Sequence, residues 1–263
     1  MDSLANTMAG ASAGVIEIVL LQPMLYCKNA TQQNLPLSAN PRVLYRGAAV
    51  SATNMAVLTG IQFPIANFFG NIIGTPGTER TPFQTIAAGF GGGAVSGIAC
   101  APMELTMVQQ QRFGGSLLGT AGGIIKRSAP DIFRGFVTSS GREAVFAAGY
   151  IGIGPELGKW LREEKGFSVA ASKFSGSVGA GLIAATLSHP LDTIKTCMQG
   201  DVKREKYTTL TKTARTLLQE GGHASFFRGW TWRVGRMICA MFILGECHAR
   251  LIPFYSDLLG HQN

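Results

Sequence analysis

The chain has 263 residues, of which 46% are hydrophobic and only 14% are charged, with 34 glycines and a formal net charge of +8. A mean hydropathy of +0.20 excludes an intrinsically disordered chain, which requires low hydrophobicity and high charge. The few basic residues stand between long apolar runs rather than in a basic patch, which argues against a nucleic-acid partner. The composition therefore favours an integral membrane protein.

Six segments are apolar and long enough to cross a bilayer, which needs about 20 residues of helix. They are residues 4–26, 48–73, 83–108, 136–157, 168–198 and 230–252. All six are rich in the small residues that let membrane helices pack closely. The alternative is a soluble helical bundle, which is disfavoured because glycine inside a helix costs about 1 kcal/mol per residue in water. The expected fold is all-α with six transmembrane helices.

Basic residues are concentrated in alternate connections between these segments. The first, third and fifth connections, residues 28–46, 109–134 and 195–228, have a combined net charge of +10. The two termini and the other connections, residues 1–6, 71–82, 156–173 and 250–263, have a net charge of zero. Since positive connections stay on the cytoplasmic side or its equivalent, both termini are expected on the opposite side.

The cysteines, histidines and N-terminus indicate no further chemistry. Five cysteines lie scattered in apolar segments without a CxxC pair, which predicts buried, reduced thiols. The four histidines lack metal-ligand spacing, and no Walker A, GxSxG or HExxH pattern occurs, so no metal, cofactor or catalytic residue is expected. The first residues contain no pattern typical of a cleavable targeting peptide. His189, directly before a proline, is expected to hydrogen-bond between helices.

Three stretches of the chain share the same landmarks in register. The odd-numbered segments contain Pro23, Pro102 and Pro190, with small residues nine and thirteen positions earlier. Nine positions after each proline stand Gln32, Gln111 and Gln199. Downstream, each repeat has an aromatic–Arg–Gly triplet that ends in Arg46-Gly47, Arg134-Gly135 or Arg228-Gly229. These columns predict a single domain of three repeats, at about residues 1–75, 76–165 and 166–263.

This repeat resembles the signature of the mitochondrial carrier family, in which a proline, an acid, a base and a glutamine follow one another on each odd-numbered helix. The clearest match is Pro190, Asp192, Lys195 and Gln199, and the resemblance covers nearly the whole chain. It implies six tilted helices in three pseudo-symmetric repeats around a central cavity. It also implies a metabolite antiporter of the mitochondrial inner membrane rather than an enzyme, with both termini towards the intermembrane space.

The resemblance further implies a gate at the matrix side, where the acid of each odd-numbered helix pairs with the base of the next. The implied pairs are Glu104 with Lys195, Asp192 with Lys28, and Leu25 with Met107. The third pair has lost both charges, which avoids the cost of stranding one buried charge. A matrix gate of two ion pairs and one apolar contact is therefore expected. The alternative for the two lysines is that they extend to lipid headgroups.

The opposite gate departs further from the family, which carries an aromatic–acid–x–x–basic motif near the end of each even-numbered helix. The aligned columns here are Ala66-Asn67 with Gly70, Gly154-Pro155 with Gly158, and His248-Ala249 with Ile252. No charge pair survives in register. This loss favours either weak closure on that side or a protein that no longer transports.

Charges inside the bundle are the candidate substrate residues, because charges are costly in a membrane. Arg142 and Arg236 each stand eight residues after a triplet arginine, and Glu143 follows the first. In the family, an Arg followed by an acid at this position is similar to carriers of amino-acid-type solutes. The two arginines would hold a carboxylate and Glu143 a cationic group. Gln62 and Glu17 are further candidates.

Two alternatives remain for these residues and for the protein as a whole. Arg142 and Glu143 are structural if they pair with neighbours such as Glu246 or Arg233. The protein is a transport-inactive subunit of an inner-membrane complex, or a membrane-organising protein, if its degenerate gates no longer cycle. The short first connection favours the second alternative: 23 residues separate Pro23 from the triplet arginine, against 32 and 38 later.

The three triplets are also candidate lipid sites. They stand at the starts of the even-numbered helices, and helix N-termini favour anions. The family resemblance implies phospholipid, specifically cardiolipin, at these positions.

Overall fold

The computed structural model describes residues 2–74 and 80–260. Within them it leaves undescribed the side chains of residues 2–11, 59, 150, 151, 241, 242, 244–246, 248, 249, 252, 256, 259 and 260. The described chain is helical and contains no β-strand. The odd-numbered spans are α1 (Asp2–Gln32), α4 (Pro82–Phe113) and α8 (Val169–Gly200). The even-numbered spans are α3 (Ala48–Ile73), α6 (Phe136–Ala147) continued by η2 (Ala148–Ile153) and α7 (Gly154–Lys165), and α10 (Trp230–Gly260).

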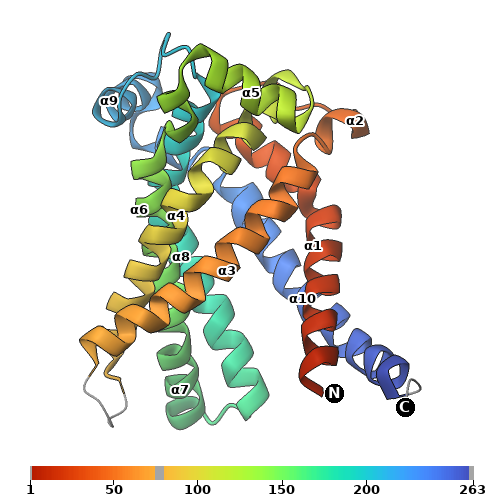
Figure 1. Ribbon diagram of the computed structural model, residues 1–263. Coiled ribbons are helices and arrows are strands. Elements are labelled where there is room, and N and C mark those ends of the chain that lie inside the picture. Colours follow the sequence, from red (N-terminus) through yellow and green to blue (C-terminus); the bar gives the residue numbers. More distant parts are fainter. Residues whose placement is uncertain (1, 75–79, 261–263) are drawn as a thin grey trace.

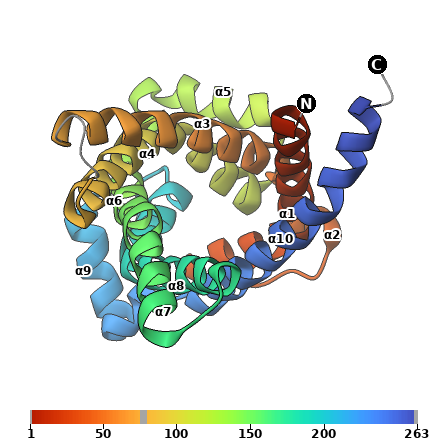
Figure 2. The same ribbon diagram turned by 90° about the horizontal axis from the view of Figure 1, so that it is seen from below.

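The six spans form a ring around a central axis when the molecule is viewed from below (Figure 2). Pairs from neighbouring repeats pack side by side: α3 on α4, α6 and α7 on α8, and α10 on α1. All three long connections lie at one end, whereas the two termini lie at the other (Figure 1). We call these the connection end and the terminal end. The expected all-α fold with six helices in three repeats is confirmed.

Hydropathy alone identifies fewer spans than the architecture does. Residues 41–73 and 82–113 each form a helical stretch that is long and apolar enough to cross a membrane. The buried charges in the remaining long helices, such as Asp192 and Lys195 in α8, lower their mean hydropathy. Hydropathy alone therefore underestimates the number of spans, because buried charges lower the hydropathy of helices that belong to the ring.

Prolines interrupt the odd-numbered helices without ending them. Pro23, Pro102 and Pro190 lie inside α1, α4 and α8, each removing one backbone donor. In the first and third repeats, the residue before the proline forms a hydrogen bond to the backbone just before the even-numbered helix of the same repeat. Gln22 Nε2 donates to the carbonyl of Arg46 at 3.1 Å, and His189 Nε2 lies 3.0 Å from the carbonyl of Arg228.

In the second repeat, the equivalent hydrogen bond comes from a residue of the neighbouring repeat. Ala101 stands before Pro102 and has no polar side chain. The carbonyl of Arg134 instead accepts a hydrogen bond from Gln199 Nε2 of the third repeat, at 3.4 Å. The expected interhelical hydrogen bond of His189 is confirmed, and its role as the equivalent of Gln22 explains its position.

The connection end carries one short helix per repeat, and the first differs from the others. α5 (Leu117–Arg127) buries Ile124 against Leu105 of α4 and Val202 of the third repeat. α9 (Leu210–Gly221) buries Leu217 against α8. In contrast, α2 (Pro41–Leu44) has four residues and buries none of them. The shortest of the three connections thus contains only this four-residue helix.

The fourth span contains a π-helical segment, η2, where a regular helix was expected. The segment ends just before Gly154-Pro155, and the proline has no N–H to donate to the preceding turn. Its glycines face both neighbours: a Cβ at Gly149 would lie 2.4 Å from Ala184 of α8, and one at Gly152 would lie 2.4 Å from Ile86 of α4. The π-helical segment, whose turn is wider than that of an α-helix, thus lies where the fourth span packs between α4 and α8.

Candidate functional site

Seven charged side chains from five spans meet on the connection-end side of the bundle. The cations are Lys28, Arg142, Lys195 and Arg233, and the acids are Glu104, Glu143 and Asp192. Each side chain is at most 15% exposed. We call this set the gate cluster. Because buried charges require partners, its four cations and three acids must be considered as one unit, with one cation in excess.

Both ion pairs expected from the repeat are present. Lys28 Nζ of α1 lies 2.7 Å from Asp192 Oδ2 of α8, and Lys195 Nζ lies 3.2 Å from Glu104 Oε1 of α4. Lys28 and Lys195 are 7% and 3% exposed, so they do not extend to lipid headgroups. Gln32 Nε2 also donates to Asp192 Oδ2, at 2.8 Å. These contacts join the third repeat to the first and the second to the third.

Asp192 is the hub of the gate cluster. Besides Lys28, its carboxylate lies 3.4 Å from Lys195 Nζ, 3.4 Å from Arg233 Nη1 and 3.5 Å from Arg142 Nε. Four cations therefore surround one carboxylate, which is 1% exposed.

Arg233 is an unexpected member of the gate cluster, although the repeat contains the signal. Arg233 stands five residues after the triplet arginine of its repeat, as Ser139 does in the second repeat. Ser139 Oγ donates to Glu104, just as Arg233 contacts Asp192. Each side chain thus supports the acid of its own repeat. The equivalent residue of the first repeat is Ser51, where the acid is replaced by Leu25.

Arg142 and Glu143 belong to the gate cluster. Arg142 Nη2 donates to both Glu104 and Glu143, and this guanidinium connects α6 to α4. Structural pairing was the alternative expected for these residues, with Arg233 or Glu246 as the partner. The partners described for Arg142 are instead Glu104, Glu143 and Asp192, and the side chain of Glu246 lies outside the described residues.

Arg236 has a different ion-pair partner from Arg142. Arg236 Nη2 donates to Glu17 Oε1 of α1 at 2.8 Å. The two arginines have the same length but turn to different acids: Arg142 meets Glu104 of α4, whereas Arg236 meets Glu17 of α1. The threefold equivalent on α3 is Asn54, whose Oδ1 is buried without a described partner.

Gln62, the remaining candidate, lies where α3 packs against α4. It is 7% exposed on α3, and its backbone carbonyl lies close to Gly92 of α4, at the contact between these helices.

The interface between the first and second repeats lacks charges at the gate. Met107 is buried, and its Cγ would lie 3.1 Å from a Cβ at Gly47. Leu25 is half-buried, and its expected contact with Met107 stays a prediction. Gln111 has no ion pair to support here, and its Oε1 accepts a hydrogen bond from Asn29 Nδ2 at 2.6 Å.

The triplet glycines bring each even-numbered helix against the odd-numbered helix of the next repeat. Gly47, Gly135 and Gly229 all have positive φ, from 77° to 81°. A Cβ at Gly229 would lie 2.9 Å from the carbonyl of Lys28, and one at Gly135 would lie 3.3 Å from Gln199 Cγ. Glycine is required because both the backbone conformation and the close approach exclude a side chain.

Two of the three triplet arginines, Arg134 and Arg228, have protein partners, which narrows the lipid prediction. Arg134 Nε donates to the carbonyl of Met198 at 2.7 Å, and Arg134 also contacts the carbonyls of Tyr207 and Thr208. Arg228 Nη1 lies 2.5 Å from Glu220 Oε2. These two guanidinium groups therefore already bind protein acceptors. A lipid at these positions would have to be bound by backbone N–H groups at the helix starts.

Glu220 collects three donors outside the membrane-spanning helices. Lys206 Nζ lies 2.7 Å and the Tyr207 hydroxyl 2.8 Å from its Oε1, and Arg228 contacts its other oxygen. Burial alone would raise the pKa of Glu220, but these hydrogen bonds lower the pKa to about 2.

At the terminal end, the columns that carry gate charges in the family hold small residues that serve helix packing. A Cβ at Gly176 of α8 would lie 2.6 Å from the backbone N of Gly158 and 2.9 Å from the carbonyl of Gly154. Gly70 faces the guanidinium of Arg80, which donates to Asn71 Oδ1 at 2.6 Å. Backbone contact between α7 and α8 thus explains why Gly154 and Gly158 carry no side chain. The third column lies among residues whose side chains are not described.

Comparison with known proteins extends this picture. Residues 167–248 match the family model described as "Mitochondrial carrier protein". The chain is 25% identical to the mitochondrial citrate transporter A of Aspergillus niger, over 90% of this chain and 87% of the relative. It is also 25% identical to the mitochondrial 2-oxodicarboxylate carrier 1 of Saccharomyces cerevisiae, over 95% and 93%. Its identity to the human mitochondrial glutamate carrier 1 is 26%, over 71% and 69%.

These similarities agree with the three-repeat helical ring and with the ion pairs at its connection end. Family members are transporters that bind small-molecule substrates, so the expectation that the chain is not an enzyme is confirmed. The chain is thus similar over most of its length to mitochondrial carriers, and these relatives support a multi-pass protein of the mitochondrial inner membrane.

Proposed function

We propose that the protein transports a small carboxylate-bearing metabolite, either a di- or tricarboxylate or an amino-acid-type solute, by alternating access. The observation that carries this proposal is the gate cluster, in which four cations, two buried and two partly buried, exceed three acids. An excess cation in a low-dielectric site favours an anionic ligand. The relatives named above, which carry citrate, 2-oxodicarboxylates or glutamate by name, support the same class.

Arg142 is the proposed first contact of the substrate. Its forked guanidinium binds Glu104 and Glu143 and is the most exposed side chain of the gate cluster, at 15%. A substrate carboxylate would compete with Glu104 for Arg142, leaving Glu104 to Lys195 and Ser139 alone. Binding would thereby weaken the link between α4 and α6 and favour opening at the connection end. Glu143 would accept the ammonium group of an amino-acid substrate.

Arg236 and Glu17 form the proposed second contact. They are paired with each other at 2.8 Å, on α10 and α1. An exchange of partners, with Arg236 binding a second carboxylate, would suit a dicarboxylate better than a monocarboxylate. Gln62 completes the proposed set from α3.

The proposed orientation places the connection end in the matrix and both termini in the intermembrane space. The net charge of +10 on the three long connections supports it. Protease added to intact mitoplasts should remove a tag from either terminus but leave the connections uncut. Cleavage within residues 201–209 under these conditions would contradict the orientation.

Phospholipid binding is proposed at the N-termini of α3, α6 and α10, where backbone N–H groups follow a glycine with positive φ. Cardiolipin is the proposed lipid. Because Arg134 and Arg228 have protein partners, their replacement should alter stability more than lipid affinity.

Uptake into proteoliposomes tests the function. Radiolabelled citrate, 2-oxoglutarate, glutamate and ADP should be compared, with and without internal counter-substrate. We expect exchange of at least one carboxylate, and a loss of about 100-fold on Arg142→Gln, equivalent to one charge-assisted contact. Arg162→Gln, an exposed arginine of α7, is the matched control. ADP exchange that is insensitive to Arg142→Gln would contradict the proposal.

A transport-inactive structural role is the second candidate, and the terminal end is the observation that favours it. Gly154 and Gly158 hold α7 against α8 by backbone contact, and Gly158 stands where family members carry the basic gate residue. Such packing resists the movement that alternating access requires. Purification in a stoichiometric complex, together with no uptake of any solute, would establish this role instead.

A further inference from the structure

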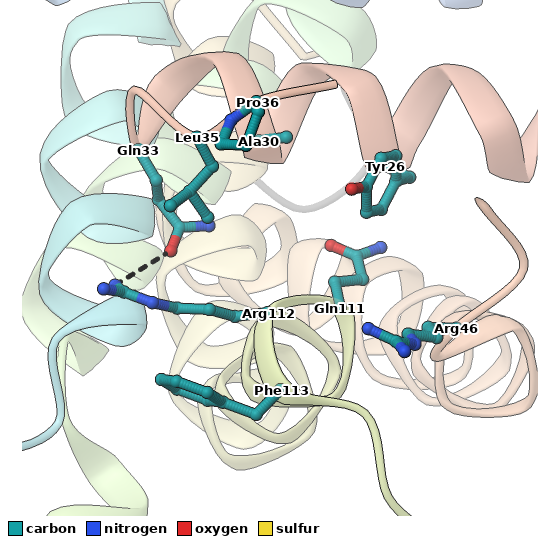
Figure 3. Close-up of a pocket in the computed structure, with 9 residues that line it drawn as sticks. All are labelled: Tyr26, Ala30, Gln33, Leu35, Pro36, Arg46, Gln111, Arg112 and Phe113. Carbon is teal, nitrogen blue, oxygen red and sulfur yellow. Dashed lines mark hydrogen bonds between the residues drawn. The ribbon is translucent and has the colours of Figure 1, made fainter. Parts of the chain in front are cut away.

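A cavity of about 330 Å³ opens at the connection end, between the ends of α1 and α4 (Figure 3). Its polar lining comes from Tyr26 and Gln33 of α1, Arg46 before α3, and Gln111 and Arg112 of α4. It lies one turn beyond Leu25 and Met107, where the third gate pair is missing. The short α2 buries no residue here, in contrast to α5 and α9 in the other repeats.

The lining presents hydrogen-bond donors and no acid. Two guanidinium groups, Arg46 and Arg112, border the cavity, and none of its nine lining residues is Asp or Glu. In the described part of the chain, neither guanidinium has an acidic side chain within ion-pair distance. Arg112 Nη1 donates to the carbonyl of Gly200 at 2.9 Å and lies 3.4 Å from Gln33 Oε1.

Gln111 provides the independent sign of a missing ligand. The residue is 4% exposed, and its Nε2 is buried without a partner. Its orientation is fixed because Oε1 accepts the hydrogen bond of Asn29 Nδ2 at 2.6 Å. The free Nε2 therefore points away from Asn29, and the amide lies between Tyr26 and Arg46 (Figure 3). A buried donor of this kind costs free energy until an acceptor arrives.

We propose that this cavity binds an oxyanion, as free phosphate or as a phosphate ester. The anion would accept hydrogen bonds from Gln111 Nε2, Arg46 and the Tyr26 hydroxyl. It would thereby tie α1 to α4 at the one repeat interface that has no ion pair. The bound anion takes the place of the lost gate charges, so closure at the connection end depends on anion concentration. This inference concerns a site outside the gate cluster and does not rest on the proposed substrate.

Thermal unfolding of the purified, delipidated full-length protein tests the proposal, with inorganic phosphate as the probe. At constant ionic strength, phosphate should raise Tm saturably by roughly 2–4 °C, whereas chloride should not. Arg46→Gln should abolish the response. Arg42→Gln, an equal change of charge on exposed α2 that does not line the cavity, should leave it intact.

Gln111→Glu separates a lost site from a damaged fold. The new carboxylate has the same shape, keeps the acceptor for Asn29, and would occupy the place of the anion beside Arg46. We therefore expect a higher Tm than wild type without phosphate, and no further rise with phosphate. A variant that is destabilised, or one that still responds to phosphate, would overturn the proposal.

Mixed micelles that contain cardiolipin or phosphatidylcholine distinguish the source of the phosphate group. A response to cardiolipin that Gln111→Glu abolishes, with none to inorganic phosphate, assigns the site to a lipid headgroup. A response to inorganic phosphate that this variant abolishes assigns it to a free anion. Equal responses of wild type and Gln111→Glu to every probe would overturn the site itself.

Discussion

The interface between the third and first repeats and the interface between the first and second differ in how they close the connection end. The former joins Lys28 to Asp192, with Gln32 and Arg233 in support. The latter places Met107 against Gly47 and leaves a cavity beside it. A threefold fold therefore does not require threefold chemistry. Two of the interfaces carry ion pairs at this end, and the third shows none among the described residues.

The largest effect is expected for Asp192→Asn at the charged interface. Four cations surround this carboxylate, so its loss leaves Lys28 and Arg233 without their acid. We expect the free energy of unfolding to fall by about 3–5 kcal/mol. Thermal unfolding in detergent measures it, with Glu143→Gln as a control that removes a single ion-pair partner. Equal losses for the two variants would refute the hub role of Asp192.

Restoring charge to the apolar interface sharpens the comparison. Leu25→Glu alone should destabilise the protein by about 2–3 kcal/mol, because it buries an unpaired acid. Adding Met107→Lys should recover most of that loss and slow uptake, since a third ion pair would hold the connection end closed. Unfolding and initial uptake rates measure both effects. A double variant as unstable as the single one would show that these side chains do not meet.

Substitution of the triplet glycines tests the backbone packing at the same two interfaces. Gly229→Ala would bring Cβ to 2.9 Å from the carbonyl of Lys28, whereas Gly47→Ala meets the flexible side chain of Met107 at 3.1 Å. Both glycines have positive φ, so each change costs about 1 kcal/mol in conformation. We expect Gly229→Ala to cost about 1 kcal/mol more. Unfolding of both variants checks the order, and the reverse order would contradict the tighter packing at the charged interface.

The smallest expected effect concerns Glu220, which binds Arg228 beside the charged interface. Its pKa of about 2 lies below the ordinary value of a glutamate, so its contribution to stability is full above about pH 4.3. That contribution is lost as the pH falls towards 2. Thermal unfolding between about pH 6 and about pH 3 should show a weaker pH dependence for Glu220→Gln than for wild type. Identical slopes would show that Glu220 has no such role.

Much of this arrangement was predictable from the repeat. The family resemblance, read at the offsets from Pro102 and Pro190, implied Glu104, Asp192 and Lys195, and the apolar segments together with the repeat predicted six spans. Backbone periodicity fixes such positions because equivalent residues of three similar repeats must occupy equivalent places. The same reasoning anticipated the missing charges at Leu25 and Met107.

The remaining contacts depend on side-chain reach and on local departures from symmetry. Arg142 and Arg236 occupy equivalent positions, yet one long side chain turns to Glu104 and the other to Glu17. The sequence offsets specify Cα positions and not these directions. Gln111 likewise occupies the glutamine column, but its role changes because no ion pair lies beside it. The cavity there follows from the absence of a longer helix, which a motif search does not detect.

Double-mutant cycles at the two interfaces test the central claim most directly. One cycle combines Lys28→Met with Asp192→Leu, and the other combines Leu25→Ala with Met107→Ala. The coupling free energy of unfolding should be about 2–3 kcal/mol for the first cycle and about 0.5 kcal/mol or less for the second. Equal coupling at the two interfaces would contradict a connection end held closed by charge on one side and left open to a ligand on the other.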